Sequence, residues 1–196
     1  MCIIRWFARQ IFRLLGWKIV GDFPPNLHKA VLVMAPHTSN WDFFYGMTTV
    51  LIKQAPAKFA IKKEAMFFPL GFILKKLGAI PIDRKRQNNN KGSMTQVSKL
   101  TQLLQEREKL ILIIAPEGTR GYAPRWKTGF YHIATRAQVP VVLGYLDYAK
   151  KHAGIGPVFY PTGDMEEDIQ QIQAFYKDKT AKYPRQGVLK DMLLKI

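Results

Sequence analysis

His37 and Asp42 enclose four residues, Thr-Ser-Asn-Trp, at the start of an apolar run. An imidazole can remove a proton from a hydroxyl or thiol near neutral pH. A neighbouring carboxylate can fix the tautomer of the imidazole and stabilise the cation that forms. The spacing favours a tight turn that opens a helix, where Asp42 would lie beside the positive end of the helix dipole. His37 and Asp42 are therefore a candidate catalytic pair.

The chain offers this pair no evident nucleophile. Its only cysteine is Cys2, and the Gly-x-Ser-x-Gly pattern of a serine hydrolase does not occur. The pair would therefore have to activate a hydroxyl that the substrate supplies. Taken alone, a His-x4-Asp pair is also typical of turns and helix caps, so the rest of the sequence has to decide between chemistry and structure.

Three further blocks follow the pair in a fixed order. They are residues 78–84 (Gly-Ala-Ile-Pro-Ile-Asp-Arg), 115–120 (Ala-Pro-Glu-Gly-Thr-Arg) and 139–142 (Val-Pro-Val-Val). The four blocks together resemble those of the lysophospholipid and glycerol-phosphate acyltransferase family, across roughly residues 30–145. The first and third blocks match at every defining position, and the second retains its glycine and its arginine.

The resemblance implies an O-acyltransferase of phospholipid biosynthesis. A fatty acyl group would move from a thioester, carried by coenzyme A or acyl carrier protein, to the hydroxyl of a lysophospholipid. Lysophosphatidate is the default acceptor, and no cofactor is implied. His37 would act as general base and Asp42 would orient it. The residues implied in binding the phosphate-bearing acceptor are Arg84, Glu117, Gly118, Thr119, Arg120 and Lys127.

The chemistry of these residue types suits an anionic acceptor. Arg120 offers a planar donor fork that fits phosphate oxygens. Gly118 allows the backbone to approach a ligand closely. Glu117 could bond a glycerol hydroxyl or brace an arginine, and the alternative is a local ion pair between Glu117 and Arg120. Arg84 and Lys127 would add positive charge, although Arg84 could equally be a solvated arginine in a basic run.

The chain departs from the family pattern at two places. Gly121 stands where a serine often follows Thr-Arg, and the fourth block continues as Leu-Gly-Tyr without a second proline. These departures concern the identity of the acceptor more than the chemistry. The alternative acceptor is the lyso form of an amino-acid-containing lipid, which the same chemistry would acylate.

A formal net charge of +16 requires an anionic partner or surface. Nucleic acid, an anionic membrane and acidic soluble molecules all qualify. A basic nucleic-acid-binding module is the alternative class of protein, but it would not explain the four blocks, and no nucleic-acid motif is present. We expect no metal either, because the four histidines show no metal-ligand spacing and a single cysteine excludes a multi-cysteine zinc site.

The N-terminus favours the membrane among these partners. Arg5, Arg9 and Arg13 recur every four residues and so share one helical face. Around them lie the apolar residues Ile4, Phe7, Ile11, Phe12, Leu14, Leu15 and Trp17. A basic, aromatic-rich amphipathic helix can lie in the interface of an anionic membrane. We predict such a helix over residues 1–20; the alternative is a helix packed on the domain with a solvated basic edge.

The remaining sequence predicts a peripheral or monotopic protein on the cytoplasmic face of the membrane. The longest uncharged runs, residues 43–52 and 65–74, are far shorter than the ~20 apolar residues that span a bilayer. No transmembrane span is therefore expected. The run at residues 66–70 is apolar without helical periodicity, so it is a candidate membrane-facing or acyl-binding stretch.

Short apolar runs alternate with amphipathic segments over residues 21–196, which predicts one α/β domain with a mostly parallel central sheet flanked by helices. The expected strands are residues 30–35, 58–61, 79–82, 110–115, 141–146 and 158–160. The expected helices are residues 41–53, 63–77, 93–108, 129–138 and 164–177, with His132 packed inside and residues 85–92 as a loop. The chemical blocks fall where strands end, and ligands bind at that carboxyl edge in open α/β sheets.

Overall fold

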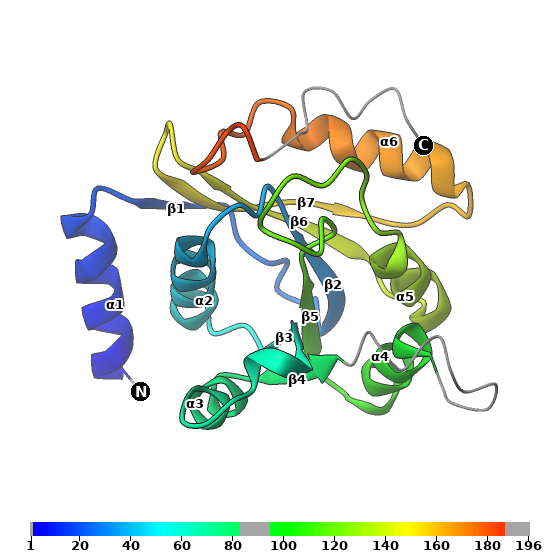
Figure 1. Ribbon diagram of the computed structural model, residues 1–196, viewed down its shortest axis with the longest axis horizontal. Helices are drawn as coiled ribbons and strands as arrows, with labels where there is room; N and C mark the ends of the chain where they lie inside the picture. The colour runs from blue at the N-terminus through cyan, green and yellow to red at the C-terminus, as the bar shows by residue number, and fades with distance from the viewer. Residues whose placement is uncertain (1, 83–94, 187–196) are drawn as a thin grey trace.

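Short apolar runs form the strands at the centre of the protein, shown in Figure 1 as a computed structural model that describes residues 2–82 and 95–186. Continuous apolar runs suit strands that are buried on both faces of a sheet. The strands of the described residues are β1 (Lys18–Val20), β2 (Lys29–Met34), β3 (Ala57–Lys62), β4 (Ala79–Ile82), β5 (Leu110–Ile114), β6 (Val141–Asp147) and β7 (His152–Phe159).

These strands form one sheet in the order β1-β7-β6-β2-β5-β3-β4. Strands β2 to β6 run parallel to one another, whereas β7 is antiparallel to β6. In the centre, Val31 of β2 pairs with Leu112 of β5 on one side and Val141 of β6 on the other. The predicted α/β fold with a mostly parallel sheet is therefore confirmed.

Helices cover both faces of this sheet (Figure 1). They are α1 (Cys2–Leu14), α2 (Asn40–Lys53), the 3-10 turn η1 (Lys63–Ala65), α3 (Leu70–Lys76), α4 (Gln96–Glu106), α5 (Gly129–Ala137) and α6 (Met165–Tyr176). Alternate residues of β2 point to opposite faces. Val31 and Val33 join a core cluster that includes Leu104 of α4, Phe130 of α5 and Ile172 of α6.

The other face of the sheet carries α1 and α2, while α3 packs beside the outer strand β4. Phe12 and Trp17 turn inward, so that the Phe12 ring lies 5.8 Å and the Trp17 ring 4.0 Å from the ring of Tyr45 on α2. The predicted N-terminal helix is present but shorter than the predicted residues 1–20, because α1 ends at Leu14 and residues 18–20 form β1. The Phe12 and Trp17 side chains belong to the protein core and not to its exposed surface. Within the described part of the chain, no helix is both long enough and apolar enough to cross a bilayer.

In the domain that follows α1, the structure corrects three further predictions, about a helix, a strand and the burial of His132. The helix expected over residues 63–77 is divided into η1 and α3, because Pro69 has no N–H to continue a helical ladder. The strand expected at residues 158–160 is the end of a longer strand, β7 (His152–Phe159). Gly154 of this strand has room for no side chain, because a Cβ there would overlap the Tyr145 ring. His132 is exposed on α5 and not packed inside. The loop predicted over residues 85–92 lies outside the described residues.

Candidate active site

The turn between β2 and α2 carries the predicted pair. Ser39 caps α2, because its hydroxyl accepts a hydrogen bond from the N–H of Trp41 at 3.1 Å. The carboxylate of Asp42 reaches back in a capping box, and its Oδ2 accepts from the N–H of Thr38 at 2.7 Å and of Ser39 at 2.8 Å. The sequence Thr-Ser-Asn-Trp-Asp therefore fixes the position of Asp42 through its own backbone.

The structure brings His37 and Asp42 together. His37 Nδ1 lies 3.2 Å from Asp42 Oδ2, and the side chains are 27% and 5% exposed, respectively. Since Nδ1 faces the carboxylate, Nε2 is the ring nitrogen that remains to exchange a proton with a ligand. The pair thus combines a buried carboxylate with a partly accessible imidazole, at the carboxyl end of the central strand β2.

Tyr148 is a third member of this arrangement that sequence reasoning missed. It follows β6, and its hydroxyl donates a hydrogen bond to Asp42 Oδ1 at 2.6 Å. Its ring packs edge-on against Trp17 at 5.0 Å, and its N–H donates to the carbonyl of Thr180 at 2.9 Å. Both oxygens of Asp42 therefore accept hydrogen bonds: Oδ2 from the β2–α2 turn (residues 35–39) and Oδ1 from Tyr148 in the β6–β7 connection.

These contacts set the charge of Asp42. Burial by itself would raise the pKa of the carboxyl, but the hydrogen bonds from His37, Tyr148 and the Ser39 backbone outweigh burial, and so the pKa of Asp42 lies below its ordinary value. Asp42 is therefore ionised at neutral pH. An ionised carboxylate beside Nδ1 holds the imidazole in one tautomer and stabilises it when it becomes a cation.

Glu117 connects the third sequence block to the first. It follows β5, is 6% exposed, and accepts a hydrogen bond from the N–H of His37 at its Oε2 (2.8 Å). Burial raises the pKa of Glu117 to about 8; the charge of Asp42 acts in the same direction, and the hydrogen bond from His37 opposes it. Glu117 therefore holds the β2–α2 turn through the backbone of His37 and is largely protonated at neutral pH. No ion pair joins Glu117 to Arg120 within the described residues.

The rest of the third block forms an exposed loop over β5. Gly118 has φ +64°, and a Cβ at this position would come within 3.0 Å of the Lys127 side chain, which therefore crosses directly over the glycine. The N–H of Lys127 donates to the carbonyl of Pro116 at 2.8 Å, which brings the two ends of the loop together. Thr119 and Arg120 are exposed, as is Lys127. The loop thus presents three cations at its surface, Arg120, Arg125 and Lys127.

The second and fourth blocks lie in the sheet. Residues 79–82 of the second block form β4, the outer strand, whereas Arg84 lies outside the described residues. The fourth block leads into β6, where Val142 pairs with Leu32 next to the β2–α2 turn. Within the described part of the chain, no group of three or more His, Cys, Asp or Glu side chains is arranged to hold a metal ion.

Comparisons with known proteins identify the family of the chain. The sequence model of the family described as "Acyltransferase" matches residues 19–143, so the chain belongs to the acyltransferase family. The chain is 32% identical over 148 residues to 1-acyl-sn-glycerol-3-phosphate acyltransferase beta of Homo sapiens; the match covers 72% of this chain and 51% of the human protein. It is 28% identical over 193 residues to 1-acyl-sn-glycerol-3-phosphate acyltransferase of Cocos nucifera, with 87% and 60% covered. The chain thus spans between half and three fifths of the length of these relatives.

Proposed function

We propose that this protein is an O-acyltransferase that transfers a fatty acyl group from a thioester to the hydroxyl of a lysophospholipid. The observation that carries the proposal is the pairing of His37 Nδ1 with the buried, ionised Asp42, which leaves Nε2 for a substrate hydroxyl. Membership of the acyltransferase family supports the reaction class. The names of the two relatives favour 1-acylglycerol 3-phosphate, which is lysophosphatidate, as the acceptor.

The chemistry follows from the geometry of the pair. As the acceptor oxygen attacks the thioester carbonyl, its proton passes to Nε2 of His37. Collapse of the tetrahedral intermediate breaks the carbon–sulfur bond, and the imidazolium returns the proton to the departing sulfur. Asp42 stabilises the transient imidazolium, and Tyr148 holds Asp42 through a hydrogen bond. The acyl group goes directly from donor to acceptor, because the acceptor oxygen is itself the nucleophile.

The acceptor phosphate would bind to the exposed loop after β5. Arg120 supplies a donor fork for two phosphate oxygens, and Lys127 supplies a second cation across Gly118. Thr119 adds a hydroxyl, and Arg84 is a further candidate from the second block. Glu117 would act here through the backbone of His37. A lysolipid with an amino-acid headgroup remains the alternative acceptor, since the same base would deprotonate its hydroxyl.

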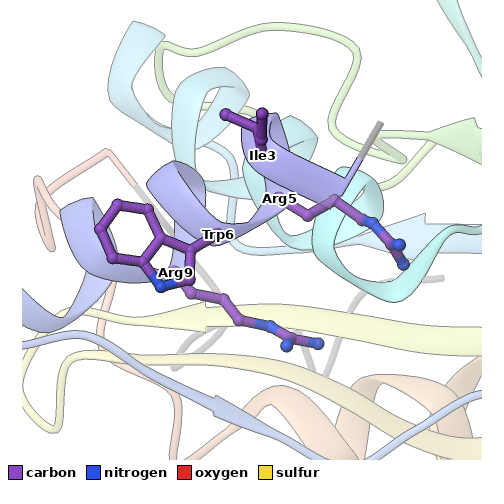
Figure 2. A pocket seen from close by; sticks show the side chains of 4 residues that line it. All are labelled: Ile3, Arg5, Trp6 and Arg9. Atoms are coloured by element: carbon purple, nitrogen blue, oxygen red, sulfur yellow. The ribbon is translucent and has the colours of Figure 1, made fainter.

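Helix α1 would associate with an anionic membrane. Arg9 and Arg13 are exposed, and Figure 2 shows Arg5 and Arg9 beside Ile3 and Trp6, around a hollow of about 410 Å³ on this helix. The exposed apolar side chains of α1 and the turn after it are Ile3, Ile4, Trp6, Phe7, Ile11, Leu14 and Leu15. Arginines on phosphates and rings at the acyl boundary would hold the protein peripherally, and we place it on the cytoplasmic face.

A transfer assay tests the proposal. The purified protein is incubated with radiolabelled acyl-coenzyme A or acyl-acyl carrier protein and with lysophosphatidate, an amino-acid-containing lysolipid, or a phosphate-free lysolipid. We expect a labelled diacyl product that depends on His37 and is formed fastest from lysophosphatidate. Absence of product with every donor and acceptor, together with tight binding to nucleic acid, would instead favour the basic binding module.

Variants of Arg120 separate the acceptors. Arg120→Ala and Arg120→Lys should both raise the Michaelis constant for lysophosphatidate at saturating donor, because an ammonium cannot reproduce a bidentate fork. Turnover of a phosphate-free lysolipid should survive both changes. Unchanged Michaelis constants for lysophosphatidate in both variants would remove Arg120 from the acceptor site.

A further inference from the structure

The segment from residue 66 to residue 73 exposes an unusual amount of aromatic surface. It links η1 to α3 and continues through the first turn of that helix (Figure 1). Phe68 is 90% exposed, and Phe67 and Phe72 are each about 60% exposed. Ile73 is also more than half exposed. Monomeric proteins seldom expose contiguous apolar patches of this kind unless something apolar covers them.

The inner side of α3 is already packed, so these side chains are not core residues out of place. Leu74 is 6% exposed, and Gly71 is buried. A Cβ at Gly71 would lie 2.5 Å from the carbonyl oxygen of Met66, which shows how closely the helix folds back on the segment before it. Phe68 lies in the turn before α3 and Phe72 in the first turn of the helix, and both side chains are largely exposed.

Basic side chains predominate in the sequence around the aromatic ones. Between residues 57 and 82 the only acidic side chain is Glu64, and it is outnumbered by Lys58, Lys62, Lys63, Lys75 and Lys76. Nζ of Lys76 lies 4.5 Å from the centre of the Phe72 ring. Aromatic rings rimmed by lysines match the interface of an anionic bilayer, where the rings enter the acyl boundary and the cations remain at the phosphates.

We propose that residues 66–73 are a second membrane contact, in which Phe67, Phe68 and Phe72 insert into an anionic phospholipid bilayer. The proposal extends the membrane association proposed above for α1. Helices α1, α2 and α3 lie toward the same side in Figure 1, where α1 is to the left of α2 and α3 is below it; α2 begins after the turn that carries His37. Two contacts fix the orientation of the protein on the surface, and attachment through one raises the effective concentration of the other.

Vesicle binding by Phe68→Ser/Phe72→Ser tests the proposal. The vesicles contain equal parts of phosphatidylglycerol and phosphatidylcholine, and binding is measured by flotation at low and high salt. We expect a loss of about tenfold in partitioning for each ring, ~1.4 kcal/mol each, that persists at high salt. Tyr160→Ser is the matched control: Tyr160 is 70% exposed beyond β7 and should be replaceable without loss of binding.

A depth probe makes the test independent of the double variant. Phe68→Cys in a Cys2→Ser background is labelled with an environment-sensitive dye, and Tyr160→Cys in the same background is the control. Vesicles should shift the emission at position 68 to shorter wavelength, and brominated lipid tails should quench it. Neither change should occur at position 160. An unshifted, unquenched label at position 68 would overturn the proposal.

The outcomes separate this contact from the proposed function. Wild-type binding by the double variant overturns the contact, even if the protein transfers acyl groups. Lost binding with unchanged turnover of a soluble short-chain acceptor supports it. Lost vesicle binding in a protein without transferase activity would uphold the contact and reject the function. If sedimentation shows a wild-type dimer that the double variant breaks while vesicle binding stays unchanged, the segment binds a second copy and the proposal is wrong.

Discussion

The two faces of the sheet use their apolar residues differently. On the face covered by α4, α5 and α6, the large apolar side chains are enclosed, and none within these described helices is among the exposed ones. On the side formed by α1, α2 and α3, large apolar side chains remain at the surface. The most exposed are Phe68 at 90% and Leu14 at 86%. Large apolar residues are therefore buried on the α4–α6 side and exposed on the α1–α3 side.

This difference indicates that the two sides of the sheet have different roles. The α4–α6 side holds the fold together, because burial of apolar area is the main favourable contribution to folding. The α1–α3 side leaves apolar area exposed, which the membrane contacts proposed above would cover. The candidate active site lies where β2 and β5 end, with His37 leading into α2 on one side and Tyr176 of α6 donating a hydrogen bond to the carbonyl of Val33 on the other. Substitutions on the two sides should consequently affect different measurements.

The largest effect should come from the site itself. We expect His37→Ala to reduce turnover by about 10²–10⁴, which is the usual contribution of a general base. His37 belongs neither to the apolar core under α4–α6 nor to the exposed apolar side chains of α1–α3. Vesicle binding and the melting temperature should therefore hardly change, and both are measured on the same preparation. A variant that kept near wild-type turnover would contradict the mechanism, and one that lost vesicle binding would break the separation of site and surface.

Glu117→Gln should change stability with pH. Native Glu117 keeps its proton up to about pH 8, whereas the unfolded chain releases it near pH 4.5. Between these values the native state binds more protons, so the contribution of Glu117 to stability is present below pH 4.5 and is lost as the pH rises through 8. Relative to wild type, the glutamine variant should gain roughly 4 kcal/mol in unfolding free energy between pH 4.5 and pH 9. Denaturant titrations across this range measure the gain, and parallel pH curves for the two proteins would refute the protonated state.

One substitution made on both sides tests the comparison directly. Leu104→Ala on α4 removes a fully buried side chain and should lower the unfolding free energy by about 2–5 kcal/mol. Leu14→Ala on α1 removes an exposed side chain and should change that free energy by less than ~0.5 kcal/mol. Vesicle binding should follow the opposite pattern, weaker for Leu14→Ala and unchanged for folded Leu104→Ala. Equal changes of the two variants in unfolding free energy and in vesicle binding would show that the two sides of the sheet do not differ in function.

Charge on α1 should have a smaller, salt-sensitive effect. Arg9→Gln/Arg13→Gln removes two exposed cations, each worth ~1 kcal/mol near an anionic surface, so binding should weaken by about 30-fold at low salt and less at high salt. Arg107→Gln/Arg136→Gln removes the same charge from the ends of α4 and α5 and serves as the control. Equal losses in the two variants would mean that total charge, and not the α1 side, directs binding.

The smallest effect should be that of Tyr148→Phe. Loss of the hydroxyl removes one hydrogen bond to Asp42, and we expect turnover to fall about tenfold with an unchanged Michaelis constant for the acceptor. Because that bond helps to lower the pKa of Asp42, the acidic limb of the pH–rate profile should move to higher pH. A fall in turnover without this movement would show that Tyr148 is only a packing residue.

The sequence predicted the parts of the molecule that local patterns determine. The strands β2, β5 and β6 are continuous apolar runs, and the His37–Asp42 contact lies within one turn. The roles of Tyr148 and Glu117 could not be predicted, because they contact Asp42 and His37 across 106 and 80 residues of chain, respectively. Local periodicity and short motifs carry no information about contacts between residues so far apart in the chain. The order of the strands in the sheet brings these residues together.

The same distances have a consequence for how the protein is synthesised. Besides the contacts of Glu117 and Tyr148, the β2–α2 turn at His37 is held by the N–H of Tyr183, which donates to Thr38 Oγ1 across 145 residues. The segments that carry the exposed apolar surface of α1 to α3 leave the ribosome before Tyr183, which follows more than a hundred residues later. A nascent chain therefore exposes these apolar helices before the β2–α2 turn at His37 has all of its hydrogen bonds. A ribosome-bound chain that ends before Tyr148 would lack the hydrogen bond from the Tyr148 hydroxyl to Asp42.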